Sequence, residues 1–395
     1  MTDMTHQEQN ATQTQFLAID HPVALESGFV FPRLQLAYET YGQLDTEASN
    51  AILLFHALTG SQHAHGWNPS VPDVGNRWTE ENHHGWWDSM IGSGKPLDTD
   101  TYFIICVNLV GGCYGSTGPA SAHPDDGLPW GSRFPELAIA DQARCQALLL
   151  DALGIQRVAL VGPSVGGLVA LSFAVLFPDR VKCLLSIGSG YRASIEHRLS
   201  VFEQILAIEL DPNFKGGDYA QGAEPARGLA FARIIGHKAF VYQEGLELRA
   251  RQNLSDSCGM LTSYKPKRST QSYMLHQGTK FARRFDANSY IRIADMWSEF
   301  DICDQQRTAS FTEALSPCAK VNIPFLVFSI DTDCCFHPEE QRGFVQLLRE
   351  AGLAVEYHTI RSDKGHDSFL LEPELYADPI RAFLTESLKN DISSF

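Results

Sequence analysis

The stretch RVALVGPSVGGLVALSFAVLF, residues 157–177, decides the fold. It begins with a continuous apolar run, which is typical of a buried strand, and ends with small and apolar residues that favour a helix before Pro178. Ser164 lies between these segments in a Gly-Pro-Ser-Val-Gly pentapeptide that fits the G-x-S-x-G pattern. A serine on a sharp turn before a helix lies close to the free N–H groups of the helix N-terminus, which can stabilise a developing anion. We interpret Ser164 as a candidate nucleophile; the alternative is a glycine-rich turn with an incidental serine.

Further apolar runs predict the rest of a sheet. They occupy residues 51–58, 102–110, 181–189, 323–330 and 354–360. The first two are continuous rather than alternating, as expected of strands that are covered on both faces. Residues 137–153 have helical spacing and are followed by Gly154 as the predicted C-cap. The pattern predicts an α/β fold with a mostly parallel central sheet flanked by helices.

The residue pattern of the sequence changes between about residues 190 and 310. Strand-like runs disappear, and helix-like segments with many Arg, Lys, Gln and Tyr residues take their place. We predict a helical lid insertion at 190–310, within a core formed by 16–189 and 311–395. Residues 1–15 are polar and are expected to be flexible.

Composition excludes several classes of protein. The 395 residues are 44% apolar and carry a formal net charge of −16, so there is no overall basic field to bind nucleic acid or an anionic membrane. No stretch approaches the roughly 18 apolar residues that a membrane span needs, and the polar N-terminus does not resemble a signal peptide. The nine cysteines are odd in number and contain no CxxC pair. These features predict reduced thiols and a cytoplasmic location.

Candidate partners for Ser164 follow two later strands. A serine hydroxyl is a poor nucleophile until a positioned base removes its proton, and proteins of the α/β-hydrolase fold supply the partners in the chain order serine, acid, histidine. His366 comes after the last predicted strand and is the predicted base. The acid is expected after the strand at 323–330, where both Asp331 and Asp333 stand. The other aspartate is then a turn residue.

An oxyanion hole requires two backbone N–H groups. One is expected from Val165, the residue after the nucleophile, and the other from the loop after an early strand. The segment HALTG (56–60) ends the apolar run at 51–58, which makes the Leu58 N–H the candidate, unless this segment is merely a turn.

Two polar clusters have less specific patterns. No metal-binding spacing orders the histidines His63, His65, His83 and His84, so we predict no metal site. A basic cluster in the insertion is either a solvated face or a resting place for the anionic tail of a cofactor. It consists of Lys265, Lys267, Arg268, Arg283 and Arg284.

Several longer segments together resemble the homoserine O-acyltransferase family, a branch of the α/β-hydrolase superfamily. The resemblance runs from about residue 35 to about residue 385 and is highly specific, because a general esterase is not expected to contain all of these segments. They are HALTG (56–60), GWWD (85–88), IGSGKPLDT (91–99), NLVGGCYGSTGPAS (108–121), DPNFKGGDY (211–219), GLAFARIIGH (228–237), FDANSY (285–290) and GHDSFLLE (365–372).

The resemblance implies a function and roles for particular residues. It implies ping-pong transfer of an acyl group from acyl-CoA, a co-substrate rather than a permanently bound cofactor, through Ser164 to homoserine. It implies that Asp333 is the acid, because the family's aspartate precedes an aromatic-Pro turn that Phe336-His337-Pro338 matches. Arg233 is implied to bind the carboxylate of the acceptor and Asp367 its amine, and a homodimer through the insertion is implied as well.

Three departures from the family pattern lie on the pocket side. Pro163 precedes the nucleophile where a glycine is usual, Ile205 replaces a usual arginine and Phe240 replaces a usual tyrosine. The leading expectation is acetyl transfer from acetyl-CoA to homoserine, with a succinyl donor or a serine acceptor as alternatives. An esterase or thioesterase would not need Arg233 and Asp367. We call Ser164, His366 and the acidic residue the Ser164 group. A non-enzymatic hydrolase-like protein would be expected to lose one of these three residues.

Overall fold

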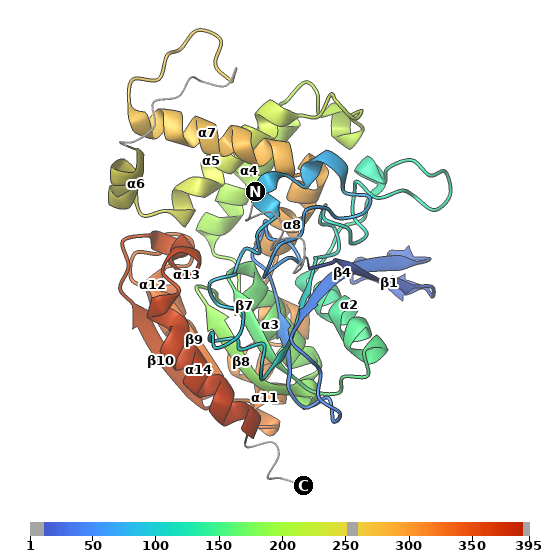
Figure 1. The fold of residues 1–395 in the computed structure, drawn as a ribbon. Helices are drawn as coiled ribbons and strands as arrows, with labels where there is room; N and C mark the ends of the chain where they lie inside the picture. Colours follow the sequence, from blue (N-terminus) through green and yellow to red (C-terminus); the bar gives the residue numbers. More distant parts are fainter. Residues whose placement is uncertain (1–11, 251–259, 390–395) are drawn as a thin grey trace, which may run out of the picture.

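One mixed sheet forms the centre of the molecule. In the computed structural model, which describes residues 12–250 and 260–389, eight strands form this sheet. Their order is β1 (Gln15–Ile19), β4 (Leu34–Tyr41), β6 (Phe103–Val107), β5 (Ala51–Leu54), β7 (Val158–Pro163), β8 (Val181–Ile187), β9 (Phe325–Ile330) and β10 (Val355–Ile360). The β1–β4 and β4–β6 pairs are antiparallel, and all other neighbours are parallel. The predicted mostly parallel sheet is therefore confirmed, and its edges β1 and β10 lie on opposite sides of the molecule (Figure 1).

The central strands are apolar because both faces of the sheet are covered. Leu53 and Leu160 point into one hydrophobic cluster, which contains residues of α2 (Ile139–Ala152), α3 (Val165–Leu176) and α12 (Pro338–Glu350). Their neighbours in the sequence belong to a second cluster on the other face, which α14 (Glu374–Lys389) helps to cover. Because successive side chains of a strand point to opposite faces, this arrangement accounts for the continuous apolar runs.

Local signals set the ends of α2 close to the predicted bounds. The Asp141 carboxylate accepts a hydrogen bond from the Ala138 N–H at 2.9 Å and thereby satisfies a free donor at the helix start. Gly154 has φ 71° and donates its N–H to the Asp151 carbonyl, as a glycine after a helix C-terminus does.

Between β8 and β9 every regular element in the described residues is helical. The elements are α4 (Ile195–Glu209), α5 (Ala226–Phe240), α6 (Gln243–Ala250), α7 (Ser269–Arg284), α8 (Ala287–Ser298), α9 (Ile302–Gln306), α10 (Phe311–Ala314), α11 (Ser316–Lys320) and the 3-10 helix η6 (Lys215–Gly217). Helices α4, α5, α6 and α7 lie together beyond one end of the sheet (Figure 1). The boundaries of a separate lid remain a prediction. Most of the segment expected to be flexible, residues 1–15, lies outside the described ranges.

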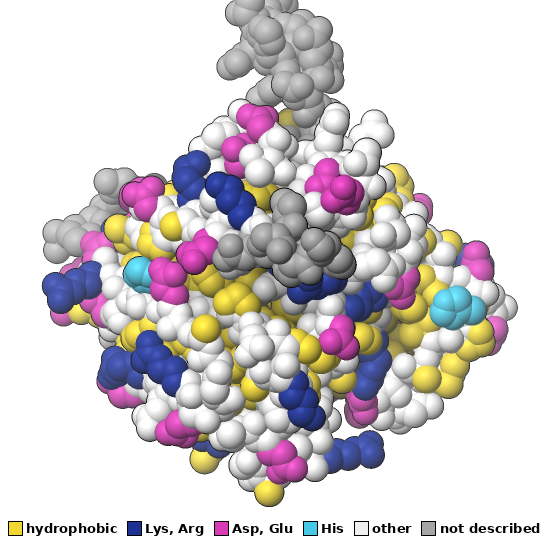
Figure 2. Space-filling view, turned by 90° about the horizontal axis from the view of Figure 1, so that it is seen from below, with side chains coloured by type: hydrophobic (Ala, Val, Ile, Leu, Met, Phe, Trp, Pro, Cys, Tyr) yellow, Lys and Arg dark blue, Asp and Glu magenta, His cyan; other side chains and the backbone are white. Residues whose placement is uncertain are grey.

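One face of the molecule shows how its charged side chains are distributed (Figure 2). In the view of Figure 2, basic and acidic side chains are interspersed, and no continuous basic patch covers the visible face. Within the described ranges, no helix is both long and apolar enough to cross a membrane.

Candidate active site

Ser164 occupies a strained turn between β7 and α3. Its φ of 55° and ψ of −130° lie outside the regions that most residues adopt, and its N–H donates to the Ile187 carbonyl at 2.8 Å. The turn depends on two glycines. A Cβ at Gly162 would lie 2.3 Å from the Gly166 carbonyl oxygen, and one at Gly166 would lie 2.2 Å from the Phe55 carbonyl oxygen. The G-x-S-x-G pattern therefore has a steric cause here.

A chain of hydrogen bonds joins Ser164 to two residues from other strands. His366 lies in the 3-10 helix η7 (Gly365–Asp367) after β10, and its Nε2 is 2.8 Å from the Ser164 Oγ. The other ring nitrogen, Nδ1, is 2.8 Å from Oδ2 of Asp333, which follows β9. All three side chains are buried. The geometry is that of a nucleophile, a base and an orienting acid.

The two candidate aspartates have different surroundings. Oδ1 of Asp333 accepts hydrogen bonds from the Cys335 N–H at 2.7 Å and the Phe336 N–H at 2.8 Å, which leaves Oδ2 for His366. Asp331 is exposed and accepts a hydrogen bond from the Ser362 N–H at 3.0 Å, in the turn after β10. The structure therefore brings Asp333, and not Asp331, to the histidine.

Aromatic rings enclose the His366 imidazole. The ring centroids of Phe240, Phe336 and Phe369 lie 6.0, 5.7 and 5.7 Å from that of the imidazole. Burial lowers the pKa of His366, but the Asp333 carboxylate opposes burial through its charge and its hydrogen bond, and the net effect is a raised pKa. His366 is consequently a stronger base than a free histidine.

The two candidate oxyanion donors lie on segments that touch. Val165 is the first residue of α3, where the N–H groups have no acceptor within the helix. The close approach of the Phe55 carbonyl to Gly166 brings the segment that contains Leu58 against this helix start. His56 holds the segment: its Nδ1–H donates to the Ala57 carbonyl at 2.8 Å, and its Nε2 accepts the Leu109 N–H at 3.2 Å. Burial lowers the pKa of His56 to about 4, so its ring stays neutral at neutral pH.

Arg233 projects from α5 between aromatic rings. Its guanidinium carbon lies 5.2 Å from the centroid of Phe240 and 5.0 Å from that of Phe281. Burial and the nearby Arg284 lower its pKa, while the charge of Asp367 acts in the opposite direction. Among the described residues no carboxylate lies within ion-pair distance of Arg233. Asp367, directly after the candidate base, also raises the pKa of His366.

Arg284, which the sequence grouped with four other basic residues, lies next to the segment that contains Leu58. Its Nη1 donates to the Thr59 carbonyl at 3.2 Å and to the Tyr114 hydroxyl at 3.0 Å, so it reaches the segment that contains Leu58. Arg283 is exposed, as are the other basic residues that the sequence grouped with it. The five residues therefore do not form one patch. No local pattern distinguishes Arg284 from Arg283, because its partners lie far away in the sequence.

The remaining sequence candidates lie as follows. Phe240, at the end of α5, is 9% exposed and contacts both Arg233 and His366, whereas Ile205 is half-buried on α4. His63 pairs with Glu39 at 2.7 Å and His65 with Asp88 at 2.6 Å, while the rings of His83 and His84 pack on Trp67. Across residues 12–250 and 260–389, no group of three or more His, Cys, Asp or Glu side chains is arranged to hold a metal ion.

The fold and the Ser164 group define the class of protein. A model of the alpha/beta hydrolase fold family matches residues 50–373. Two esterase structures share this fold: esterase E22 with 23% identity, a TM-score of 0.82 and coverage of 94% of this chain and 100% of its own, and acetyl esterase MekB with 23% identity, a TM-score of 0.74 and coverage of 95% and 96%.

More similar relatives narrow the class. The chain is 37% identical to a homoserine O-acetyltransferase of Rhodospirillum rubrum, over 95% of this chain and 93% of the relative. It is 40% identical to a homoserine O-succinyltransferase of Laribacter hongkongensis, over 92% and 93%. The crystal structure of a homoserine O-acetyltransferase from Bacillus anthracis has 28% identity and a TM-score of 0.83, over 95% and 98%. This chain belongs to the homoserine O-acyltransferase family within the α/β-hydrolase superfamily.

Proposed function

We propose that this enzyme transfers an acetyl group from acetyl-CoA to the hydroxyl of L-homoserine through an acyl-Ser164 intermediate. The observation that carries the proposal is the position of Arg233. A largely enclosed guanidinium without an ion-pair partner among the described residues lies on the Phe240 ring, which itself packs against His366. An esterase of a neutral ester has no use for such a cation, whereas an amino-acid acceptor brings a carboxylate to it.

The first half of the reaction uses the buried Ser164 group. His366 Nε2 takes the proton of Ser164 Oγ while this oxygen attacks the thioester carbonyl of acetyl-CoA. The N–H groups of Leu58 and Val165 stabilise the oxyanion. The C–S bond then breaks, the proton on His366 passes to the leaving sulfur, and CoA departs as the thiol. Asp333 keeps the imidazole in the required orientation and stabilises its positive charge.

The second half transfers the acyl group to the acceptor. Arg233 binds the carboxylate of homoserine and Asp367 its ammonium group, so the two opposite charges orient the hydroxyl toward the acyl-serine. His366 removes the proton of this hydroxyl while the homoserine oxygen attacks the acyl carbonyl carbon and forms the new ester bond. The ester bond to Ser164 then breaks, and the proton passes from His366 to Ser164 Oγ. The products are O-acetylhomoserine and free enzyme, and CoA is a co-substrate rather than a resident cofactor.

A succinyl donor is the second candidate, because one relative at 40% identity is a homoserine O-succinyltransferase. The chemistry at Ser164 is the same for both donors. The two candidates differ only in the acyl chain that the pocket accepts.

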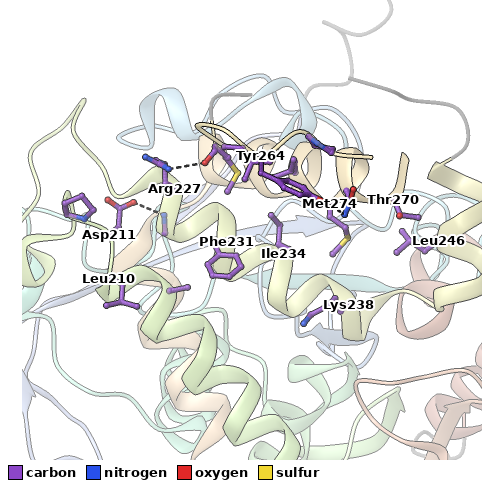
Figure 3. A pocket seen from close by; sticks show the side chains of 18 of the residues that line it. Leu210, Asp211, Arg227, Phe231, Ile234, Lys238, Leu246, Tyr264, Thr270 and Met274 are labelled. Carbon is purple, nitrogen blue, oxygen red and sulfur yellow. Dashed lines mark hydrogen bonds between the residues drawn. The ribbon is translucent and has the colours of Figure 1, made fainter. Parts of the chain in front are cut away.

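A homodimer through the insertion forms part of the proposal. An apolar stripe of exposed residues with helical spacing supports it: Ile195, Leu199, Phe202 and Leu206 on α4, and Leu210 after it. The stripe continues into an apolar pocket of about 980 Å³ between the insertion helices, where Leu210, Phe231, Ile234 and Met274 lie (Figure 3). Sedimentation velocity of the wild type and of Phe202→Glu tests it, with a monomer expected only for the variant.

We also propose a cytoplasmic location. The nine cysteines are scattered along the sequence and contain no CxxC pair, which agrees with reduced thiols in a reducing compartment.

Steady-state kinetics test the proposed function. We expect CoA release with acetyl-CoA and homoserine together, and parallel double-reciprocal lines when both concentrations vary, because CoA leaves before the acceptor reacts. Intersecting lines would rule out the acyl-enzyme route. A higher kcat/KM for succinyl-CoA than for acetyl-CoA would assign the enzyme to the second candidate.

A further inference from the structure

The loop that carries Asp333 contacts the insertion through the first turn of α4. We call residues 333–337 the acid loop. His197, on this turn, is 6% exposed, and its Nε2 hydrogen-bonds to the carbonyl oxygen of Cys335. At the surface, the Glu196 carboxylate lies 3.1 Å from Nε2 of His337. Two neighbouring side chains of one helical turn therefore reach the acid loop, one buried and one exposed.

The N-cap of α4 fixes the tautomer of His197. Ser194 accepts the His197 N–H through its Oγ at 3.3 Å, and its own N–H donates to His197 Nδ1 at 3.2 Å. Because Nδ1 acts as an acceptor, the proton of the neutral ring lies on Nε2, the atom that faces Cys335. Burial lowers the pKa of His197 and so favours the neutral ring. The imidazole also packs against Trp297 and Phe336, each at a centroid distance of 4.9 Å.

The peptide group that His197 contacts also holds the candidate acid. The carbonyl of Cys335 and the N–H of Phe336 belong to one planar peptide unit. That N–H donates to Asp333 Oδ1 at 2.8 Å, while Asp333 Oδ2 faces His366. A donor at the oxygen end of a peptide polarises its N–H and fixes its plane. The chain of contacts therefore runs from the cap of α4 through one peptide unit to Asp333.

We propose that His197 is a positioning residue for acyl-enzyme formation, which acts by fixing the Cys335–Phe336 peptide and thereby the Asp333 carboxylate. The inference rests on the proposed function, because it takes Asp333 and His366 as the acid and the base. It gives the insertion a second task beside acceptor binding: the same helix that carries the apolar stripe holds the acid in place.

Two substitutions that differ by one methylene group separate this role from helix capping. In this chain Asn82 and Gln271 occupy the same third helical position as His197, and their side-chain oxygens accept the N-cap N–H at 3.3 and 3.1 Å. Both His197→Asn and His197→Gln should therefore keep the cap of α4. Only glutamine is long enough to present an amide donor to the Cys335 carbonyl. Glu196→Gln, which removes the exposed contact on the same turn, is the matched control.

The experiment measures the pre-steady-state burst of CoA release and, without any donor, the far-downfield N–H proton of His366 by NMR. We expect His197→Asn to slow the burst about tenfold, as the loss of one hydrogen bond would, with KM for the donor unchanged. The His366 resonance should shift upfield. His197→Gln and Glu196→Gln should remain close to wild type in both readouts. If His197→Asn does not fold, His197→Phe, whose ring has no donor, takes its place.

Two results would overturn the inference: a His197→Asn burst and resonance equal to those of the wild type, or a glutamine variant as impaired as the asparagine variant. Failure of the wild-type enzyme to release CoA in the absence of the acceptor would instead contradict the proposed function. The NMR comparison would still decide the role of His197, because it needs no donor.

Discussion

The Ser164 group and the surroundings of Arg233 adjoin each other, but they differ in how their polar atoms are satisfied. In the first region, His366 uses both ring nitrogens, and Asp333 accepts three hydrogen bonds from protein groups. In the second region, a guanidinium lies against the rings of Phe240 and Phe281, and no carboxylate among the described residues pairs with it. His366 and Asp333 thus have their hydrogen-bond partners without a ligand, whereas the Arg233 guanidinium has no carboxylate partner among the described residues.

This difference supports the proposal that one region transfers protons and the other binds the acceptor. An enclosed charge without a partner is costly, and the lowered pKa of Arg233 is one expression of that cost. A bound carboxylate would offset it. The proposed chemistry uses groups that follow the strands β7, β9 and β10, and the proposed acceptor site combines Arg233 of the insertion with Asp367 of the core.

The largest effect is expected within the first region, where the two aspartates can be compared directly. Asp333→Asn should lower kcat by about 10⁴-fold, because His366 loses the carboxylate that orients it and stabilises its charge. Asp331→Asn changes only an exposed side chain that accepts the Ser362 N–H, and it should have a mild effect. Steady-state rates of both variants decide the assignment, and the reverse order would move the acid to Asp331.

Removing the Arg233 charge should impair the reaction with the acceptor but not acyl-enzyme formation. Arg233→Ala should cost about 2–5 kcal/mol of transition-state stabilisation with homoserine, as expected when one partner of an enclosed ion pair is lost. Acyl-enzyme formation should be nearly unchanged. Arg283→Ala, which removes an exposed arginine of α7, is the control. Equal losses in both half-reactions would contradict the division of work.

The pH dependence sharpens the account of the first region. His366 must be neutral to accept the Ser164 proton, and its pKa is raised above 6.5. The kcat/KM for the acyl donor should therefore fall about tenfold per pH unit below a midpoint that lies above 6.5. In Asp333→Asn the burial of the ring remains and the carboxylate charge is gone, so the midpoint of the residual activity should move down. A wild-type midpoint below 6.5 would show that burial, rather than the Asp333 carboxylate, has the larger effect on the pKa of His366.

The smallest effect is expected at Phe240. Phe240→Tyr restores the hydroxyl that is usual in the family, next to Arg233 and His366. With homoserine as the acceptor, the rate should stay similar or improve. If the pocket is instead fitted to serine against the bare ring, an unpaired buried hydroxyl should cost roughly 1–3 kcal/mol. Comparing kcat/KM for homoserine and serine in both proteins distinguishes these outcomes.

Local sequence patterns predict the sheet, and they also select Ser164 and His366, whose Oγ and Nε2 atoms lie 2.8 Å apart in the structure. The apolar runs mark strands that are buried on both faces, and the glycines at 162 and 166 have a steric cause that any turn of this kind shares. The choice between Asp331 and Asp333 is different, because both follow β9 and only the three-dimensional course of the loop separates them. Here the family resemblance, not the local pattern, indicated the aspartate that lies next to His366.

Contacts between distant segments could not be predicted in this way. Arg284 has the same residue type as its neighbour Arg283, yet it donates hydrogen bonds to Thr59 and Tyr114 of the core. The role proposed for His197 likewise depends on its contact with Cys335, which lies 138 residues further along the chain. Such contacts depend on how the insertion packs on the core, and no periodicity or motif encodes that packing.

The central claim is that an acyl group resides on Ser164 before the acceptor arrives. Intact-mass measurement of the wild type and of Ser164→Ala after incubation with acetyl-CoA, and separately with succinyl-CoA, tests it most directly. Ser172→Ala, which removes a hydroxyl from α3 that pairs with Gln305, is the control. We predict that the wild type and the control gain the mass of one acetyl group, that Ser164→Ala gains none, and that homoserine removes the added mass. An acylated Ser164→Ala protein, or a wild type that gains no mass while it still turns over both substrates, would contradict the account.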